Sequence, residues 1–195
     1  MRVTDKFVFF WTKRDVFSQW YPAKFEVKGI LFPNAEALMM FSKSILFQYD
    51  NVSAQDAIRI INEERKAAGL QPQVGFARKP SGKLPDGSLS AIMETDNPKV
   101  AKAQGRKVEG FDKRVWDSKI IGILRVANRA KFMQNPNLFQ KLISFSGLTF
   151  VEASPYDEIY GVGMSEDHPD IEDPSKWKGE NKLGYVLTEL AKELS

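Results

Sequence analysis

The sequence predicts a mainly helical fold with a few short β-strands, and an α+β fold is the alternative. Apolar residues recur with the helical period of about 3.6 residues in several segments, whereas runs of strand length are few and short. The chain has 195 residues, a length typical of one domain, and it contains no internal repeat. We therefore expect a single domain over residues 1–195 with a loop insertion at about 66–94.

In the first half of the chain, the pattern predicts strands at 6–11 and 25–31 and helices at 34–48 and 54–66. Phe7, Phe9 and Trp11 alternate with other apolar residues, which favours a buried strand. Asn34 is the expected N-cap of the first helix, because its side chain accepts a hydrogen bond from a free backbone N–H. Between 66 and 89 the chain is rich in Gly, Pro and Ser, so we expect residues 68–90 to form an irregular loop, mobile or near a pocket mouth.

In the second half, the predicted elements are helices at 98–104, 113–132 and 136–145, a strand at 149–153 and a helix at 183–194. Asn97 is the expected cap of the first of these helices, and Gly147 follows the end of the third. Along 113–132, Trp116, Ile120 and Ala127 lie on one helical face. Helices therefore account for most of the predicted structure.

The composition excludes several kinds of site. The chain has no cysteine, which excludes disulfides and thiolate catalysis, and its one histidine, His168, lies in an acidic loop where we expect it to be solvated. We therefore expect no metal and no other cofactor. The net charge of +3 and pI of about 9.0 permit an anionic ligand or nucleic acid. No run of about 18 apolar residues is present, so we expect a cytoplasmic protein without a membrane partner.

Glu36, Met40 and Lys43 form a stripe on the predicted helix 34–48, because residues four and seven positions apart share one helical face. A carboxylate and an amine on one face suit general acid–base catalysis beside a nucleophilic or cationic partner. The alternative is an exposed stripe with a weak charge pair. Since this helix is apolar nearly all round, we expect Glu36 or Lys43 to be partly buried and paired.

Arg106 and Trp116 are candidate ligand contacts. Arg106 follows Gly105, where a ligand can approach the backbone closely, and guanidinium groups bind phosphate through two hydrogen bonds. The position of Trp116 suits two roles equally well, stacking on a ring of the ligand and packing in the core.

Residues 150–164 combine carboxylates, aromatic rings and glycines in one short stretch. They predict a buried strand that ends at Glu152, a Ser-Pro turn, and a glycine loop that contains Tyr160 and Gly161. Glu152 requires a partner in its apolar strand, either in a structural ion pair or in a site. Asp157 follows the turn, where its carboxylate is free to face a cleft. The alternative is an ordinary surface loop.

Several motifs follow one another along the chain. They are Phe17-Ser-Gln-Trp-Tyr21-Pro22, Phe32-Pro-Asn-Ala-Glu36 with Met39, Met40 and Lys43 downstream, residues 98–108, Phe111-Asp112 with Trp116-Asp117, Lys131-Phe132-Met-Gln134-Asn135-Pro136, VEASPYDEIYGVG at 151–163, and Trp177-Lys-Gly179-Glu-Asn181-Lys-Leu-Gly184. Together they resemble the motifs of the NADAR family, also called YbiA-like, over nearly the whole chain except about 66–94. The chain departs from that pattern in this insertion and at Tyr160, where the family usually has tryptophan.

The resemblance implies a YbiA-like fold and one pocket lined by Glu36, Lys43, Trp116, Asp157, Gly161, Trp177 and Asn181. Within it we predict Glu36, Lys43 and Asp157 as catalytic residues, with the carboxylates of Glu36 and Asp157 facing a shared cavity. The predicted substrate-binding residues are Arg106, Trp116, Glu152, Tyr160, Gly161, Trp177 and Asn181. Lysine forms Schiff bases with carbonyl carbons, so Lys43 is a candidate nucleophile toward a ring-opened sugar.

The resemblance also implies hydrolysis of an N-glycosidic bond to ribose. The expected substrate is ADP-ribose attached to a nucleobase such as guanine, in nucleic acid or in a nucleotide-like small molecule. One alternative is the hydrolysis of riboflavin-pathway intermediates, and another is a module that binds ADP-ribose or a nucleotide without turnover. A nucleic-acid-binding accessory protein is a third alternative, favoured only by the basic pI.

Overall fold

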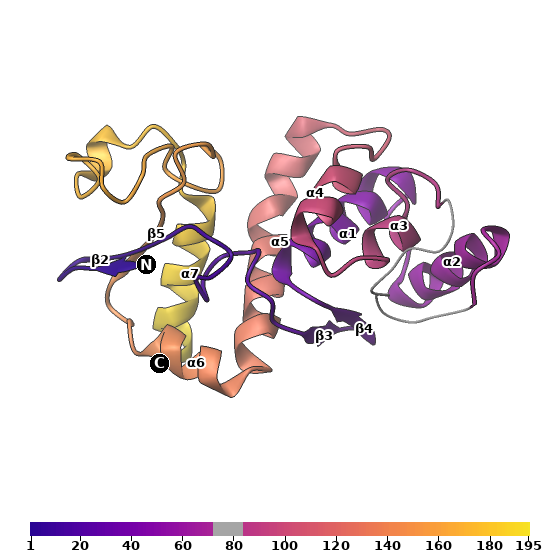
Figure 1. Ribbon diagram of the computed structural model, residues 1–195, viewed down its shortest axis with the longest axis horizontal. Coiled ribbons are helices and arrows are strands. Elements are labelled where there is room, and N and C mark those ends of the chain that lie inside the picture. The colour runs from indigo at the N-terminus through magenta and orange to yellow at the C-terminus, as the bar shows by residue number, and fades with distance from the viewer. Residues whose placement is uncertain (72–83) are drawn as a thin grey trace. The chain divides into compact units, whose positions relative to one another are not determined.

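The computed structural model describes residues 1–71 and 84–195. In chain order (Figure 1), the elements are β1 (Arg2–Val3), β2 (Phe7–Phe10), β3 (Phe25–Val27), β4 (Ile30–Phe32), α1 (Ala35–Gln48), α2 (Ala54–Ala67), α3 (Leu89–Met93), α4 (Pro98–Gly105), α5 (Lys113–Met133), α6 (Pro136–Ile143), β5 (Thr149–Glu152), the 3-10 turn η1 (Pro174–Lys176) and α7 (Lys182–Leu194). The fold is mainly helical with a few short strands, which confirms the predicted class. Within the described ranges, no helix has the length and apolar character needed to cross a membrane.

The chain divides into two compact units. Unit 1 consists of Met1–Tyr21 and Leu124–Ser195, and unit 2 consists of Pro22–Ile123. Helix α5 contributes its first half to unit 2 and its second half to unit 1. Each unit has its own sheet and its own buried core, so each is described by itself.

The sheet of unit 1 places the ends of two strands at one edge. Strand β2 lies between β1, which is antiparallel to it, and β5, which is parallel to it. In the parallel pair Phe7 lies opposite Thr149 and Phe10 lies opposite Glu152. Because parallel strands point the same way, the segments that follow Phe10 and Glu152 leave the sheet at the same edge.

Strand β5 is held in place by aromatic packing and by a hydrogen bond to α7. Phe17 packs edge-to-face on Phe150, with ring centroids 4.8 Å apart, and also contacts Phe132 and Phe145. The hydroxyl of Thr188 on α7 accepts a hydrogen bond of 2.9 Å from the backbone N–H of Phe150. In Figure 1 the helix α7 accordingly runs alongside β5. The strand that carries Glu152 is therefore held by buried packing and by α7.

Helix α1 is the central helix of unit 2. The Asn34 side-chain oxygen accepts a hydrogen bond of 2.9 Å from the Ala37 N–H, and its amide nitrogen donates to the Asp96 carbonyl at 3.1 Å. The predicted N-cap is thus confirmed, and α1 begins at Ala35. The first half of α1 is buried on all sides, as its nearly continuous apolar sequence predicts.

The prediction of one strand over 25–31 is wrong. This stretch forms the antiparallel hairpin of β3 and β4, in which Phe25 lies opposite Phe32. Lys28 and Gly29 make the turn with φ values of 52° and 81°. Two-residue hairpin turns need positive φ and usually use Asn-Gly or Asp-Gly, so the Lys-Gly pair gave only a weak turn signal.

Helix α3 lies at the end of the predicted insertion 66–94 and overlaps the predicted irregular loop 68–90 only at residues 89 and 90. Residues 72–83 of that loop fall outside the described chain. The N-cap of α3 is Ser88, whose hydroxyl accepts a hydrogen bond of 3.1 Å from the Ala91 N–H. All five of its residues are buried. A single buried turn and a half has too few residues to display a helical period, which is why the pattern missed it.

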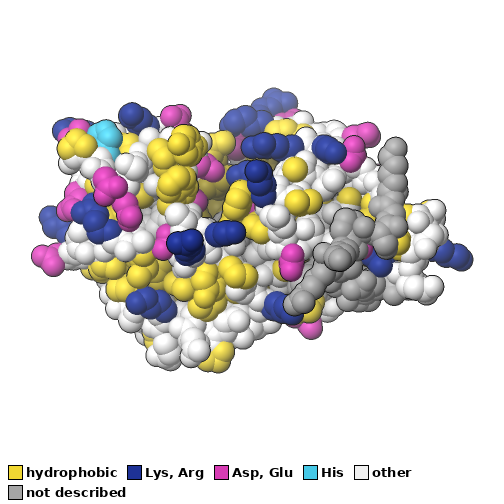
Figure 2. All heavy atoms as spheres, viewed as in Figure 1, with side chains coloured by type: hydrophobic (Ala, Val, Ile, Leu, Met, Phe, Trp, Pro, Cys, Tyr) yellow, Lys and Arg dark blue, Asp and Glu magenta, His cyan; other side chains and the backbone are white. Residues whose placement is uncertain are grey.

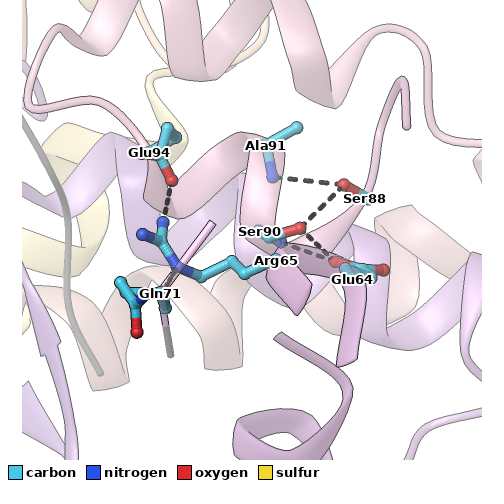
Figure 3. A network of polar contacts seen from close by, with 7 residues as sticks. All are labelled: Glu64, Arg65, Gln71, Ser88, Ser90, Ala91 and Glu94. Carbon is cyan, nitrogen blue, oxygen red and sulfur yellow. Dashed lines mark hydrogen bonds and ion pairs between the residues drawn. The ribbon is translucent and has the colours of Figure 1, made fainter. Parts of the chain in front are cut away.

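A polar network joins α2 to α3 (Figure 3). The Glu64 carboxylate accepts a hydrogen bond of 3.0 Å from the Ser90 backbone N–H. The Arg65 guanidinium donates to the Gln71 carbonyl at 2.8 Å and forms a buried ion pair with Glu94. Removing one partner of this buried ion pair should cost about 3–5 kcal/mol, because the other charge would stay buried without compensation.

Candidate active site

Glu36 occupies the first turn of α1. Its side chain is 2% exposed, and Met40, one turn later, is also buried. The positive end of the helix dipole favours a carboxylate at this position. Glu36 and Met40 are therefore buried in unit 2, which argues against the alternative of a fully exposed stripe.

Lys43 lies half-buried two turns after Glu36. Its ammonium nitrogen is 4.1 Å from the centroid of the Phe111 ring, a cation–π contact that compensates part of the cost of burial. Burial lowers the pKa of the Lys43 amine below its ordinary value of 10.5, and the positive charge of Arg106 lowers it further. Both causes raise the fraction of neutral, nucleophilic amine at neutral pH.

Arg106 is brought near Lys43 by the packing of α4 on α1. Gly105, the last residue of α4, lies so close to Met40 that a Cβ there would overlap the Met40 sulfur. The Arg106 side chain is exposed, whereas the neighbouring Lys107 pairs with Asp86 at 2.8 Å. Because the charge of Arg106 acts on Lys43, the two cations together favour a phosphate or diphosphate ligand. Glu36, Met40, Lys43, Arg106 and Phe111 are called the α1 cluster below.

Trp116 belongs to the aromatic packing beneath this cluster. Its side chain is buried, and its ring centroid is 6.4 Å from that of Phe47, which in turn packs edge-to-face on Phe111 at 5.3 Å. The structure places Trp116 in the core, and its contact with substrate stays a prediction. Through Phe47, it supports the ring that lies under the Lys43 amine.

In unit 1, residues 152–163 form a loop, called the β5 loop below, that begins at Glu152. The Glu152 side chain is half-buried at the carboxyl end of β5. Its backbone N–H donates to Asn181 Oδ1 at 3.0 Å, and its carbonyl accepts from the Val162 N–H at 3.0 Å. The loop therefore leaves the strand at Glu152 and returns to it at Val162, within eleven residues.

Asp157 organises the β5 loop. Its Oδ1 accepts hydrogen bonds from the backbone N–H groups of Ile159, at 3.0 Å, and of Tyr160, at 2.8 Å. These bonds fix the carboxylate and leave its Oδ2 without a hydrogen-bond partner within residues 1–71 and 84–195. A half-buried carboxylate with one oxygen held and one available suits the orientation of water or the stabilisation of a developing positive charge.

The other predicted residues of unit 1 hold the loop by backbone and core contacts. A Cβ on Gly161 would lie 2.6 Å from the Glu152 carbonyl oxygen, so only glycine fits there. Asn181 is buried and donates to the Phe150 carbonyl at 2.9 Å, in addition to its bond with Glu152. The indole N–H of Trp177 donates to the Ile171 carbonyl at 2.8 Å. These three residues position the loop, and their contact with substrate stays a prediction.

Lys131 is a buried lysine of unit 1 that the sequence argument named within a motif but did not predict as a site residue. Its side chain is 0% exposed, and its amine donates a hydrogen bond of 2.8 Å to the Ser18 carbonyl. Burial lowers the pKa of this amine from 10.5 to about 7. Leu124, Asn128 and Lys131 lie on one helical face and all are buried, but their spacing alone does not show the burial.

The α1 cluster lies in unit 2, whereas Glu152, Asp157, Tyr160, Gly161, Trp177 and Asn181 lie in unit 1. The convergence of the Glu36 and Asp157 carboxylates on one cavity therefore stays a prediction. No group of three His, Asp or Glu residues in the described parts of the chain has the geometry to hold a metal ion.

Comparison with known proteins adds independent information. The NADAR domain family model matches residues 76–195. N-glycosidase R617 of Acanthamoeba polyphaga mimivirus is 30% identical over 201 residues, which cover 97% of each chain. N-glycosidase YbiA of Escherichia coli K12 is 31% identical over 104 residues, which cover 53% of this chain and 58% of YbiA. The NMR structure of E. coli YbiA superposes with a TM-score of 0.62 at 22% identity, covering 99% of this chain and 87% of that one, and thus shares its fold.

Proposed function

Because this chain belongs to the NADAR family, we propose that it is an N-glycosidase that removes ADP-ribose from a nucleobase such as guanine. The observation that carries the proposal is the α1 cluster, in which a half-buried lysine with a lowered pKa lies beside an arginine. The lysine supplies a nucleophile for the sugar carbon, and the arginine supplies a ligand for the diphosphate. The names of the relatives R617 and YbiA support an N-glycosidase in general.

In the first step, the neutral Lys43 amine forms a bond to the anomeric carbon of the ribose, and the bond from that carbon to the base breaks. The sugar ring opens as the amine becomes a Schiff base. Of the two protons that the amine loses, one goes to the leaving base and one to the ring oxygen. Water then adds to the Schiff base, which releases ADP-ribose as its aldehyde form and restores the amine.

A carboxylate of unit 1 has a proposed role in this chemistry. Asp157, with one oxygen fixed by two backbone N–H groups, is the candidate for protonating the base and later for activating water. In an alternative without a covalent intermediate, a carboxylate orients water directly against an oxocarbenium-like sugar. Trapping of a covalent adduct separates the two mechanisms.

The test is incubation of the purified protein with an oligonucleotide that carries ADP-ribosylated guanine and, separately, with riboflavin-pathway intermediates. Release of free ADP-ribose from the first substrate, followed by mass spectrometry, is the expected result. Release of a sugar only from the riboflavin intermediates would transfer the proposal to that substrate class. Tight binding of ADP-ribose without release from either substrate would identify a binding module.

A further inference from the structure

Two buried amide side chains of unit 1 have hydrogen-bonding groups without a protein partner. Gln19 is 5% exposed, and neither its Oε1 nor its Nε2 has a hydrogen-bond partner in residues 1–71 and 84–195. Asn128 on α5 is fully buried; its Nδ2 donates to the Leu124 carbonyl at 2.8 Å, but its Oδ1 has no partner in the same ranges. Buried polar atoms almost always bond to protein or to ordered water, because burial without a hydrogen bond is costly. The two amides therefore point to a ligand.

Lys131 links the surroundings of the two amides. Its Nζ donates to the Ser18 carbonyl at 2.8 Å, and Gln19 is the residue that directly follows Ser18. On α5, Asn128 lies three residues before Lys131. Helical side chains extend back over the preceding turn, so the Lys131 side chain reaches Ser18 from the turn that carries Asn128. The amine and the two amides are thus gathered beside Ser18 in the interior of unit 1.

The Lys131 amine also has a donor to spare. On the face seen in Figure 2, Lys and Arg side chains lie at the surface, whereas Lys131 is fully buried. Among the described residues, the Ser18 carbonyl is its one hydrogen-bond partner, and its other contacts are with the rings of Tyr21 and Phe132, at 5.6 and 5.1 Å from the centroids. A neutral amine has two N–H groups and a protonated one has three. In either state, at least one N–H remains for a further acceptor.

The chemistry of these groups selects the ligand. The Gln19 and Asn128 oxygens need a donor, whereas the Gln19 nitrogen and the Lys131 amine need an acceptor. An anion would meet two carbonyl oxygens, and a metal cation would meet the amine, so neither fits all four groups. Water donates and accepts, and it is small enough for groups that are enclosed by the core.

We propose that unit 1 contains an internal hydration site that links Gln19 to Asn128 and Lys131. One water donates to Gln19 Oε1 and to Asn128 Oδ1 and accepts an N–H of Lys131. A second water accepts from Gln19 Nε2 and donates to the first. The site joins the turn at Ser18 to α5 and does not depend on the proposed glycosidase activity, because none of its groups takes part in that chemistry.

The experiment combines thermal unfolding with NMR of the parent chain. Gln19→Met keeps the shape of the side chain and removes its polar atoms, so it should lower the thermal midpoint by at least about 3 °C if the amide is bonded to water. Asn128→Leu should also lower it, and the double variant should lose less than the sum of the two, because both side chains hold the same water. Gln140→Met, at an exposed glutamine of α6 in the same unit, is the matched control and should keep the parent's midpoint. In the parent, the Gln19 side-chain amide protons should show cross-relaxation with a long-lived bound water.

Three results would overturn the inference. A thermal midpoint that rises in Gln19→Met would show that the amide is buried without a partner, because removing an uncompensated polar group stabilises the fold. Additive losses in the double variant would show that Gln19 and Asn128 share no water. A midpoint of the parent that rises with chloride at constant ionic strength would identify an anion in place of water. If a variant does not fold, the water signal at Gln19 in the parent chain decides, and its absence rules out the site.

Discussion

The α1 cluster and the β5 loop hold their polar groups in opposite ways. In the α1 cluster, helix packing at Gly105 and Met40 sets the backbone, so the Lys43 and Arg106 side chains are not needed to hold it. In the β5 loop, polar side chains hold the backbone, since Asp157 Oδ1 and both polar atoms of the Asn181 amide bind main-chain groups. One region presents its charges on a rigid support, and the other uses polar side chains as the support.

This difference predicts different consequences of mutation. Substitutions at Lys43 and Arg106 in the α1 cluster should change turnover or substrate affinity and leave the free energy of unfolding nearly unchanged. Substitutions in the β5 loop should reduce stability and activity together. The predictions below test this separation, beginning with the largest effect.

Lys43→Ala should reduce kcat by at least about a thousandfold, because the proposed nucleophile is removed. Lys43→Arg should fail as well, since a guanidinium stays protonated and is a poor nucleophile. The thermal midpoint of both variants should stay close to that of the parent. Borohydride added during turnover should trap a sugar adduct, which peptide mass spectrometry should locate on Lys43.

Lys107→Ala is the matched control, because Lys107 neighbours Arg106 but pairs with Asp86. It should keep the parent's activity and adduct yield. Substantial activity in Lys43→Arg, with no adduct trapped, would contradict the nucleophile and leave Lys43 as a phosphate ligand. An adduct on Lys131 would move the chemistry from the α1 cluster to unit 1.

Asn181→Ala should destabilise the protein by roughly 2–4 kcal/mol, because it leaves a buried N–H of Glu152 and a buried carbonyl of Phe150 without partners. The thermal midpoint should fall by on the order of 10 °C. Asn181→Asp keeps the acceptor for Glu152 and loses only the donor, so it tests the two bonds separately. Lost activity at unchanged stability would mean that Asn181 acts on the substrate and does not hold the loop.

The sequence predicted the α1 cluster better than the β5 loop for a physical reason. Helical spacing fixes which side chains share a face, so Glu36, Met40 and Lys43 could be grouped from their positions alone. In the β5 loop, partners such as Glu152 and Asn181 are 29 residues apart, and only the folded chain shows that the amide binds the strand. The motifs marked these residues as functional, but they did not show which residues hold the loop and which contact the substrate.

The remaining errors have the same origin in long-range packing. The five residues of α3 form a helix because Ser88 caps them and the core of unit 2 buries them, which no local period reports. Lys131 was missed because an isolated lysine in a helix is ordinarily solvated, and its burial depends on Ser18, which lies 113 residues away in sequence. The Asn34 cap, in contrast, is local, and it was predicted correctly.

Arg106→Ala should raise KM by about tenfold to a hundredfold with little change in kcat, because a hydrogen bond between charged groups is worth about 1.5–3 kcal/mol. The expected loss is in affinity for the diphosphate, so ADP-ribose should bind the variant more weakly by the same factor in calorimetry. Arg106→Lys should recover part of the affinity. A fall in kcat without a change in KM would place Arg106 at the reacting atoms and contradict its assignment to the diphosphate.

Lys131→Met tests the effect of a fully buried amine on the stability of unit 1. The pKa of Lys131 is about 7 in the folded chain and 10.5 as the ordinary value, so between these pH values the unfolded chain binds a proton that the folded chain lacks. The stability of the parent should therefore rise with pH through this window, and the cost of burying the amine should be present in full below pH 7. In Lys131→Met this contribution is absent, so the unfolding free energy of the variant relative to the parent should decrease by about 2 kcal/mol between pH 7 and 9. Urea denaturation at pH 7, 8 and 9 measures it, with Lys119→Met, an exposed lysine on the same helix, as the control. A difference that stays constant with pH would show that the Lys131 amine keeps its proton in the folded chain, and its bond to Ser18 would then be that of a buried cation.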